Sequence, residues 1–198
     1  MTQPVLVNAG CGEIGSGYLP AYFDDWQLYR VDLDPACKPD LIASITDLSA
    51  IPDGVANAVW SAHCVEHLYA HEVGRALNEF WRILADDGFA CIIVPDLQSV
   101  ANHVAADQLH DVLYESPAGP ITAHDILFGF GAAIARGNTS MAHKCGFTPS
   151  AMMQCLRSTP FAEVVLRRRT NLELAAIATK KSGMTQEQRD ALLSALEL

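Results

Sequence analysis

A glycine-rich segment after the first apolar run is the earliest part of the chain that could do chemistry. Gly10, Gly12 and Gly15 satisfy the spacing G-x-G-x-x-G, and Asp32 follows about twenty residues later. Glycine lets the backbone approach a ligand closely, and a carboxylate ending the next strand can accept hydrogen bonds from two ribose hydroxyls. The pattern predicts a nucleotide or nucleoside site, with a tight turn that binds nothing as the alternative.

The residues after this loop separate two kinds of ligand. A dinucleotide site needs a helix that begins at the third glycine and holds the pyrophosphate at its N-terminus. Here Ser16, Gly17 and Pro20 follow and delay or shorten that helix. A nicotinamide-dependent oxidoreductase should also carry Tyr-x-x-x-Lys, and neither Tyr69 nor Tyr114 begins that motif. A nucleoside without a pyrophosphate therefore fits better than NAD.

A second cluster of reactive side chains has the spacing H-x-x-E-H. It consists of His63, Glu66 and His67, and on a helix this spacing is the signature of inverted zinc peptidases. Such a zinc site needs a third protein ligand and a long helix. This segment instead comes directly after an apolar run, Ala58–Ala62. We therefore predict that the protein holds no metal.

Short apolar runs alternate with helical patterns in the first half of the chain. That alternation is typical of a parallel sheet with crossover helices. Apolar residues at three- and four-residue spacing predict a helix over about 71–84, ended by a turn at Asp86-Asp87-Gly88. The predicted buried strands are Val5–Ala9, Gln27–Val31, Leu41–Ser44, Ala58–Ala62 and Phe89–Val94.

The second half begins irregularly and ends in a predicted hairpin. Residues 97–148 form only short helical pieces broken by glycine and proline, so we interpret them as an insertion that covers a site. A helix at 149–158 then precedes two strand-like runs, 162–168 and 171–179, which are close enough to pair as a hairpin. A capping-box pattern, Thr185 with Gln188, begins a last helix.

Together these elements predict one Rossmann-like α/β domain over residues 1–183, followed by a C-terminal helix in 184–198. The sheet should have seven strands, mostly parallel with an antiparallel last strand, and helices on both faces.

Several of these segments resemble, in order, the motifs of class I S-adenosylmethionine-dependent methyltransferases. The similarity is greatest to bacterial predicted methyltransferases whose first motif begins with Asn. It covers residues 4–96 closely and 140–179 more loosely. The segments are Val-Asn-Ala-Gly-Cys-Gly at 7–12, Val-Asp-Leu-Asp-Pro at 31–35, Ile-Thr-Asp-Leu at 45–48, Val-Glu-His-Leu at 65–68 and the stretch 79–95.

The resemblance implies S-adenosylmethionine as the cofactor and assigns parts of the chain to it. Residues 10–12 would pass beneath the methionine part, Asp32 would hold the ribose, and Asp47 with Leu48 would meet the adenine. His63 would line the cofactor pocket and His67 would be structural. The cofactor-binding candidates are Asn8, Gly10, Cys11, Gly12, Asp32, Leu33, Asp47, Leu48, Ser61 and His63.

Methyl transfer from a sulfonium is an in-line displacement, so the protein mainly aligns the partners and excludes water. A hydroxyl acceptor would profit from a general base, and histidine is the usual choice. We predict His143 as the catalytic base, with His63 as the second candidate and a solvated loop histidine as the alternative. The expected acceptor is a small molecule with a hydroxyl or amine, bound under residues 97–148. An NAD(P)-dependent oxidoreductase and an inactive methyltransferase-like partner module remain open.

The net charge excludes some kinds of binding partner. The 198 residues carry 13 Lys plus Arg against 23 Asp plus Glu, a net charge of -10, which would repel duplex nucleic acid or an anionic membrane. The one basic run, Arg167–Arg169, should be a solvated hairpin end because neighbouring strand residues face opposite ways. The six scattered cysteines should be reduced and mostly buried, and we expect a cytoplasmic protein. The oligomeric state is left open.

Overall fold

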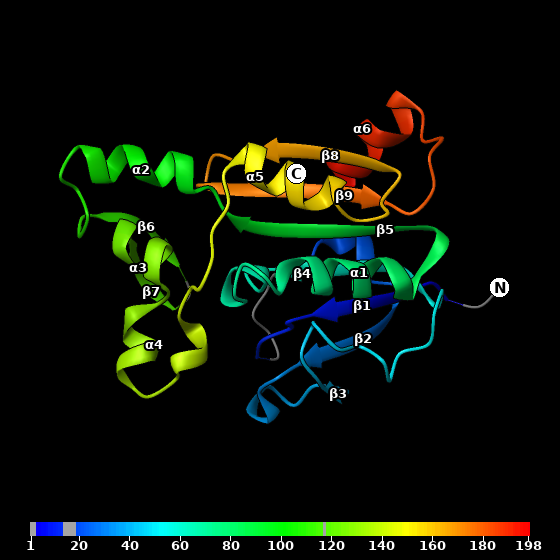
Figure 1. Cartoon of the computed structure of the whole chain (residues 1–198), viewed down its shortest axis with the longest axis horizontal. Coiled ribbons are helices and arrows are strands. Elements are labelled where there is room, and N and C mark those ends of the chain that lie inside the picture. The colour runs from blue at the N-terminus through cyan, green and yellow to red at the C-terminus, as the bar shows by residue number, and fades with distance from the viewer. Residues whose placement is uncertain (1–2, 14–18, 117) are drawn as a thin grey trace.

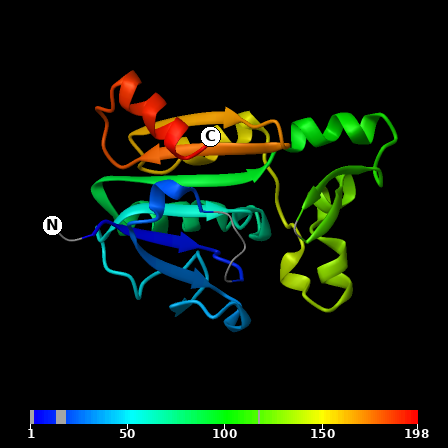
Figure 2. The same ribbon diagram turned by 180° about the vertical axis from the view of Figure 1, so that it is seen from behind.

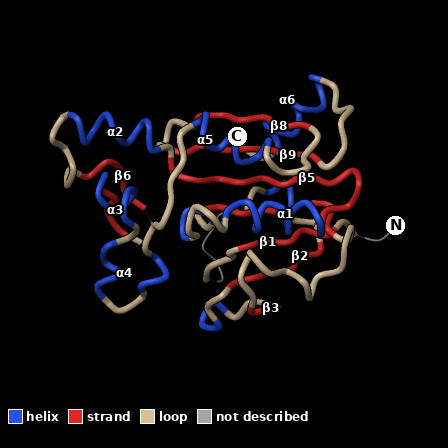
Figure 3. Tube along the Cα trace, in the orientation of Figure 1, coloured by secondary structure: helices blue, strands red, loops and turns tan. Residues whose placement is uncertain are grey.

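The computed structural model describes residues 3–13, 19–116 and 118–198, which fold around one large sheet (Figures 1 and 3). Its strands lie in the order β3-β2-β1-β4-β5-β9-β8. They are β1 (Val5–Ala9), β2 (Gln27–Asp32), β3 (Leu41–Ile42), β4 (Ala56–Ala62), β5 (Leu84–Pro95), β8 (Glu163–Arg168) and β9 (Glu173–Thr179).

Six of the seven described strands of this sheet run in one direction. The first five pair in parallel, whereas β9 is antiparallel to both β5 and β8. The hairpin therefore places its reversed strand, β9, between β5 and β8. The predicted Rossmann-like sheet with an antiparallel last strand is confirmed. Because the carboxyl ends of the parallel strands share one edge, loops after β1, β2 and β4 meet there.

Helices cover both faces of the sheet (Figures 1 and 2). On one face α1 (Val73–Ile83) and α5 (Pro149–Arg157) pack over a core to which α1 contributes a stripe of buried residues, with Phe80 fully enclosed. On the other face α6 (Gln186–Ala195) and a short 3-10 helix, Ala21–Phe23, enclose a second core. The amphipathic pattern near residues 71–84 correctly predicted α1.

The junction between α1 and β5 differs from the prediction. The Asp-Asp-Gly run at 86–88 predicted a turn ahead of the strand, but β5 already begins at Leu84. In the pairing with β4, Ala56 lies opposite Leu84 and Ala58 opposite Phe89, so the intervening part of β5 bulges out of the ladder. The bulge leaves both aspartates exposed, which accounts for their turn-like composition.

The insertion, residues 97–148, projects beyond the carboxyl ends of the strands (Figure 1). It was expected to hold only short helical pieces, and the hairpin β6–β7 was missed because its strands are short and largely exposed. A small core of its own, including Val100 and Ile126, holds it together. Its elements are α2 (Leu97–Ala105), β6 (Val112–Ser116), β7 (Gly119–Thr122), α3 (Ala123–Phe128) and α4 (Gly131–Ala135).

The C-terminal helix α6 begins as the sequence predicts. The side chain of Thr185 accepts a hydrogen bond from the backbone N–H of Gln188, and the Gln188 side chain accepts one from the N–H of Thr185. None of the helices in the described part of the chain has both the length and the apolar composition that crossing a membrane requires.

The cysteines are all free thiols, as expected, but they are less buried than expected. Only Cys11 and Cys91 are buried, and the other four are partly exposed. Three of those four, Cys64, Cys145 and Cys155, still pack against the main core.

Candidate functional site

The glycine loop is fixed by the end of β2 and by the segment after β4. The backbone N–H groups of Gly10 and Cys11 both donate to the Val31 carbonyl, at 2.9 and 3.0 Å. Gly10 and Gly12 have φ of +79° and +60°, in the left-handed region that favours glycine. A Cβ on Gly10 would lie 2.2 Å from the Sγ of Cys64, whereas one on Gly12 would meet no described atom within 4 Å. Gly10 is thus needed for packing, and Gly12 faces open space that no described residue fills.

Asp32 ends β2 next to this open space. Its Oδ2 accepts the N–H of Gly12 at 2.9 Å, and its Oδ1 accepts the N–H of Asp34 at 2.9 Å. Each carboxylate oxygen keeps a second acceptor position, so Asp32 can still bind two ligand hydroxyls. Leu33 is 65% exposed, which leaves an apolar side chain for a flat ring. These residues fit a nucleoside; Gly15, the third glycine of the motif, lies outside the described residues.

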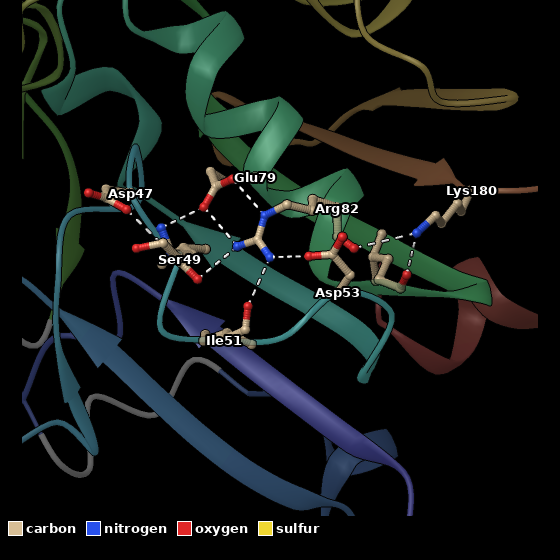
Figure 4. A network of polar contacts seen from close by, with 9 residues as sticks. Asp47, Ser49, Ile51, Asp53, Glu79, Arg82 and Lys180 are labelled. Atoms are coloured by element: carbon tan, nitrogen blue, oxygen red, sulfur yellow. Dashed lines mark hydrogen bonds and ion pairs between the residues drawn. The ribbon is translucent and has the colours of Figure 1, made fainter.

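A polar network fixes the loop after β3 that carries Asp47 and Leu48 (Figure 4). Arg82, on α1, donates to the carbonyls of Leu48 and Ile51 at 2.8 and 2.9 Å, and its guanidinium also binds the Glu79 carboxylate. The N–H of Leu48 donates to Glu79 Oε2 at 2.6 Å, and the Leu48 side chain is fully buried. In this structure Asp47 is therefore the exposed member of the pair.

The remaining cofactor candidates come from β1 and β4. Asn8 is half-buried on β1 beside Trp60 of β4, and Cys11 is nearly buried in the loop. Ser61 is fully buried near the end of β4, and its Oγ has no hydrogen-bond partner among the described residues. All three belong to the carboxyl edge of neighbouring strands. We call Gly10, Gly12 and Asp32, with the loop around them, the glycine-loop edge.

His63 stands directly after β4 and is held by two carboxylates. Its backbone is in the left-handed region, with φ of +51°, which is rare for a non-glycine residue. Nε2 lies 2.8 Å from Glu173 Oε1, and Nδ1 lies 3.4 Å from Glu66 Oε1. Burial by itself lowers the pKa of His63, but the two carboxylates outweigh it and raise the pKa to about 10. His63 is therefore an imidazolium at neutral pH and cannot accept a proton there.

Glu173 links His63 to the arginine run, and sequence analysis missed this link. Arg169 donates to Glu173 Oε2 at 2.7 Å, and Arg168 donates to the buried Asp96 at 2.7 Å. The prediction of a solvated hairpin end is therefore wrong for Arg169, which is largely enclosed, whereas Arg168 is half exposed although it pairs with Asp96. The pKa of Glu173 is lowered, because its contacts with His63 and Arg169 exceed the opposing effect of burial. A charged residue opening an otherwise apolar strand was the signal available in the sequence.

His143 lies close to His67, although the two come from distant parts of the chain. The N–H groups of Lys144 and Cys145 donate to the Glu66 carbonyl, at 2.9 and 3.2 Å, and so fix the loop segment that carries His143. The ring centroids of His67 and His143 are 4.9 Å apart. Burial lowers the pKa of His143, so its imidazole is neutral at neutral pH.

These side chains line one pocket of about 490 Å³ between the sheet edge and the insertion. Glu13, which follows the glycine loop, also lines it and connects it to the glycine-loop edge. The insertion was expected to cover the acceptor, but the sequence did not indicate which of its apolar residues would form the wall. We call this pocket the histidine pocket and define it by four residues, His63, Glu66, His67 and His143. Its apolar wall includes Tyr114, Ile121, Ile126, Phe130 and Met141.

Comparison with known proteins identifies the fold and the class of enzyme. Residues 7–92 match a family model described as a methyltransferase domain. That segment runs from the middle of β1 through most of β5 and includes Gly10, Gly12, Asp32 and His63. The match supports an S-adenosylmethionine-dependent methyltransferase, with S-adenosylmethionine as the cofactor. No curated protein matches the chain.

Solved structures share the fold at low sequence identity. A possible histamine N-methyltransferase from Thermotoga maritima is 13% identical, with a TM-score of 0.57 over 91% of this chain and 84% of that one. An S-adenosylmethionine-dependent methyltransferase from Archaeoglobus fulgidus is 14% identical, with a TM-score of 0.56 over 89% and 86%. The 1,6-didemethyltoxoflavin-N1-methyltransferase of Burkholderia thailandensis, bound to its substrate and S-adenosylhomocysteine, is 17% identical, with a TM-score of 0.53 over 91% and 72%.

Proposed function

We propose that this enzyme methylates a small molecule through a hydroxyl or an amine bound in the histidine pocket. The pocket carries the proposal, because its volume of about 490 Å³ suits a small organic molecule and not a polymer. The bound substrate of the toxoflavin enzyme is likewise a small heterocycle. The net charge of -10 also disfavours duplex nucleic acid. The free cysteines support a cytoplasmic location, where thiols stay reduced.

For the cofactor, we assign the glycine-loop edge and its neighbours. Residues 10–12 would lie beneath the methionine part, since Gly12 faces open space. Asp32 would accept the ribose hydroxyls, and the exposed Leu33 would cover the adenine together with Asp47 and the backbone of Leu48. Asn8, Ser61 and His63 complete this side from β1 and the end of β4. The first motif that begins with Asn8 supports placement in the Asn-type bacterial subgroup.

The cofactor supplies an activated methyl group and its own leaving group, so the protein supplies alignment and a place for the acceptor proton. His143 is neutral and lines the pocket, which suits it to accept that proton. His63 is already protonated, so it cannot accept the proton and instead contributes a positive charge. His63 and Arg169 are cations and Glu66 and Glu173 are anions, so the group adds no net positive charge near a sulfonium.

A binding and turnover screen tests the proposal. S-adenosylhomocysteine should raise the melting temperature of the protein and NAD should not, because only a ligand of the folded state stabilises it. Release of S-adenosylhomocysteine should then depend on a small hydroxylated or aminated acceptor, and Asp32→Ala should reduce it. Stabilisation by NAD alone, or turnover only with an oligonucleotide or protein, would contradict the proposal.

A further inference from the structure

We propose that Glu66, His67 and His143 bind one divalent transition-metal ion in the histidine pocket, where the ion would hold the hydroxyl of the acceptor. The inference rests on the proposed function for the acceptor and replaces the role of His143 as a free base with that of a ligand. One ligand atom from each residue can be chosen so that all three lie within 4.8 Å of one another. Side-chain rotations that shift these atoms by about 1 Å would place each of them at the roughly 2.0–2.2 Å from a zinc ion that nitrogen and oxygen ligands keep.

Both histidines already have the hydrogen bonds that metal ligands need behind them. Nδ1 of His143 lies 2.8 Å from the Ile126 carbonyl, and Nδ1 of His67 lies 3.3 Å from the Ala142 carbonyl. A carbonyl only accepts, so each Nδ1 carries the ring proton and each Nε2 keeps a lone pair. Metal-bound histidines are usually oriented in this way by a backbone carbonyl or carboxylate.

Glu66 offers a buried carboxylate oxygen that no described residue satisfies. Its side chain is 1% exposed, and neither carboxylate oxygen accepts a hydrogen bond from any described residue. His63 Nδ1 already pairs with Oε1 at 3.4 Å, whereas Oε2 has no hydrogen bond from a described residue. A buried carboxylate oxygen is normally hydrogen-bonded, paired or bound to a metal. A cation between Glu66 and the two imidazoles would satisfy it.

The donor set indicates the kind of ion. Two imidazole nitrogens and one carboxylate suit zinc, cobalt, manganese or ferrous iron, whereas magnesium and calcium prefer oxygen ligands. Three protein ligands leave at least one position for water or substrate, as in catalytic and not structural sites. That position would face the apolar wall that includes Ile121, Phe130 and Met141. The acceptor class is therefore a small, largely apolar molecule with a hydroxyl.

The ion would change how the acceptor loses its proton. A hydroxyl bound to a divalent ion becomes more acidic, so its proton can leave to solvent while Nε2 of His143 serves as a ligand. The oxygen then takes the methyl group, the carbon–sulfur bond breaks, and sulfur keeps the electron pair. His67 matters for this route but not for a route in which His143 is a free base.

This site differs from the zinc peptidase pattern considered in the sequence. In that pattern His63 would be a ligand, but here it pairs with Glu173. The sequence weighed against a metal because a third ligand and a long helix were lacking. His143 supplies the third ligand from a distant segment, and Glu66 and His67 lie on a single 3-10 turn, Val65–His67. The metal proposal therefore opposes our own prediction from sequence, and one measurement decides between them.

Metal titration of the full chain tests the proposal without an acceptor. Chelator-treated protein should bind one Co²⁺ or Zn²⁺ per chain by calorimetry, and Co²⁺ should produce visible absorption bands typical of protein ligands. Glu66→Gln, His67→Ala and His143→Ala should each weaken binding by more than the roughly 10- to 100-fold that altered second-shell partners cost. His124→Ala is the matched control, because that ring lies against His110 and Phe128. The His124→Ala variant should bind the metal with the affinity of the parent protein.

Two results would overturn the metal site: no stoichiometric binding by the parent protein, or unchanged affinity in both Glu66→Gln and His67→Ala. Circular dichroism of each variant guards against misfolding, and Glu66→Gln keeps the side-chain shape. The affinity for S-adenosylhomocysteine is measured on the metal-free protein in parallel. Cofactor binding without metal binding removes this inference alone, whereas metal binding without cofactor binding removes the proposed function.

Discussion

The glycine-loop edge and the histidine pocket are built from contacts of very different range along the chain. At the glycine-loop edge, Gly12 and Asp32 are 20 residues apart, within one strand–loop–strand unit. In the histidine pocket, His63 and Glu173 are 110 residues apart, and His67 and Ala142 are 75 apart. The edge depends on backbone conformation, whereas the pocket depends on the docking of the insertion and of β9. The two should therefore fail independently when they are mutated.

The largest expected effect comes from the pocket. His143→Ala should slow acceptor turnover by about a hundredfold or more, the usual contribution of a positioned proton acceptor, and metal loss would act in the same direction. The affinity for S-adenosylhomocysteine should stay within about twofold, because His143 lies outside the glycine-loop edge. Steady-state kinetics and calorimetry measure the two quantities. Loss of cofactor affinity would show that the pocket and the edge are one unit.

The converse effect comes from the edge. Asp32→Ala should weaken S-adenosylhomocysteine binding by about 1–3 kcal/mol, since a carboxylate that accepts hydroxyl hydrogen bonds makes charge-assisted contacts. Isothermal titration calorimetry gives the dissociation constant. Asp34→Ala is a useful comparison, because Asp34 caps the next 3-10 helix, Pro35–Cys37, and is exposed. An unchanged constant in Asp32→Ala would remove this residue from the cofactor site.

The range of the contacts also explains what could be predicted from the sequence. Strand β1 and Asp32 at the end of β2 are signalled by local apolar runs and by glycine spacing, so both were placed correctly in the fold. The partners in the histidine pocket are set by which strands and loops become neighbours, and no local pattern joins His143 to Glu66. Glu173 was missed because its place depends on the sheet order: β9 pairs with β5, which lies between β9 and β4.

A smaller effect concerns the charge of His63. Its pKa is raised to about 10, so its ion pairs contribute stability fully below the unfolded value of 6.5, and this contribution is lost as pH rises through 10. Glu173→Gln should lower the pKa of His63, measured by NMR of the imidazole ring. The stability difference between parent and variant should shrink above pH 10.

Glu163→Gln is the matched control for this titration. Glu163 also opens a strand and pairs with an arginine, Arg189, at 2.9 Å, but it does not belong to the histidine pocket. It should leave the pKa of His63 unchanged. If Glu173→Gln also leaves that pKa unchanged, the pairing at 2.8 Å does not set the charge of His63.

The smallest expected effect uses two capping boxes, one in the insertion and one in the C-terminal helix. Thr122 caps α3 by accepting from the N–H of Asp125, and Thr185 caps α6 through Gln188. Each Thr→Ala substitution should cost about 1 kcal/mol of stability, the typical value for losing an N-cap. The functional consequences should differ, because Asp125 lines the histidine pocket and also accepts the N–H of Gly131 at 2.9 Å.

Thr122→Ala should therefore raise KM for the acceptor and leave cofactor affinity unchanged, because a loosened α3 disturbs one wall of the pocket and not the glycine-loop edge. Thr185→Ala should change neither constant, although chemical denaturation shows a similar loss of stability. The pair thus separates a local effect on the insertion from a general loss of stability. If both variants raised KM equally, global stability would control acceptor binding and the insertion would not act as a separate wall. If Thr122→Ala weakened cofactor binding, the insertion would reach across to the glycine-loop edge, and the independence of the two regions would be wrong.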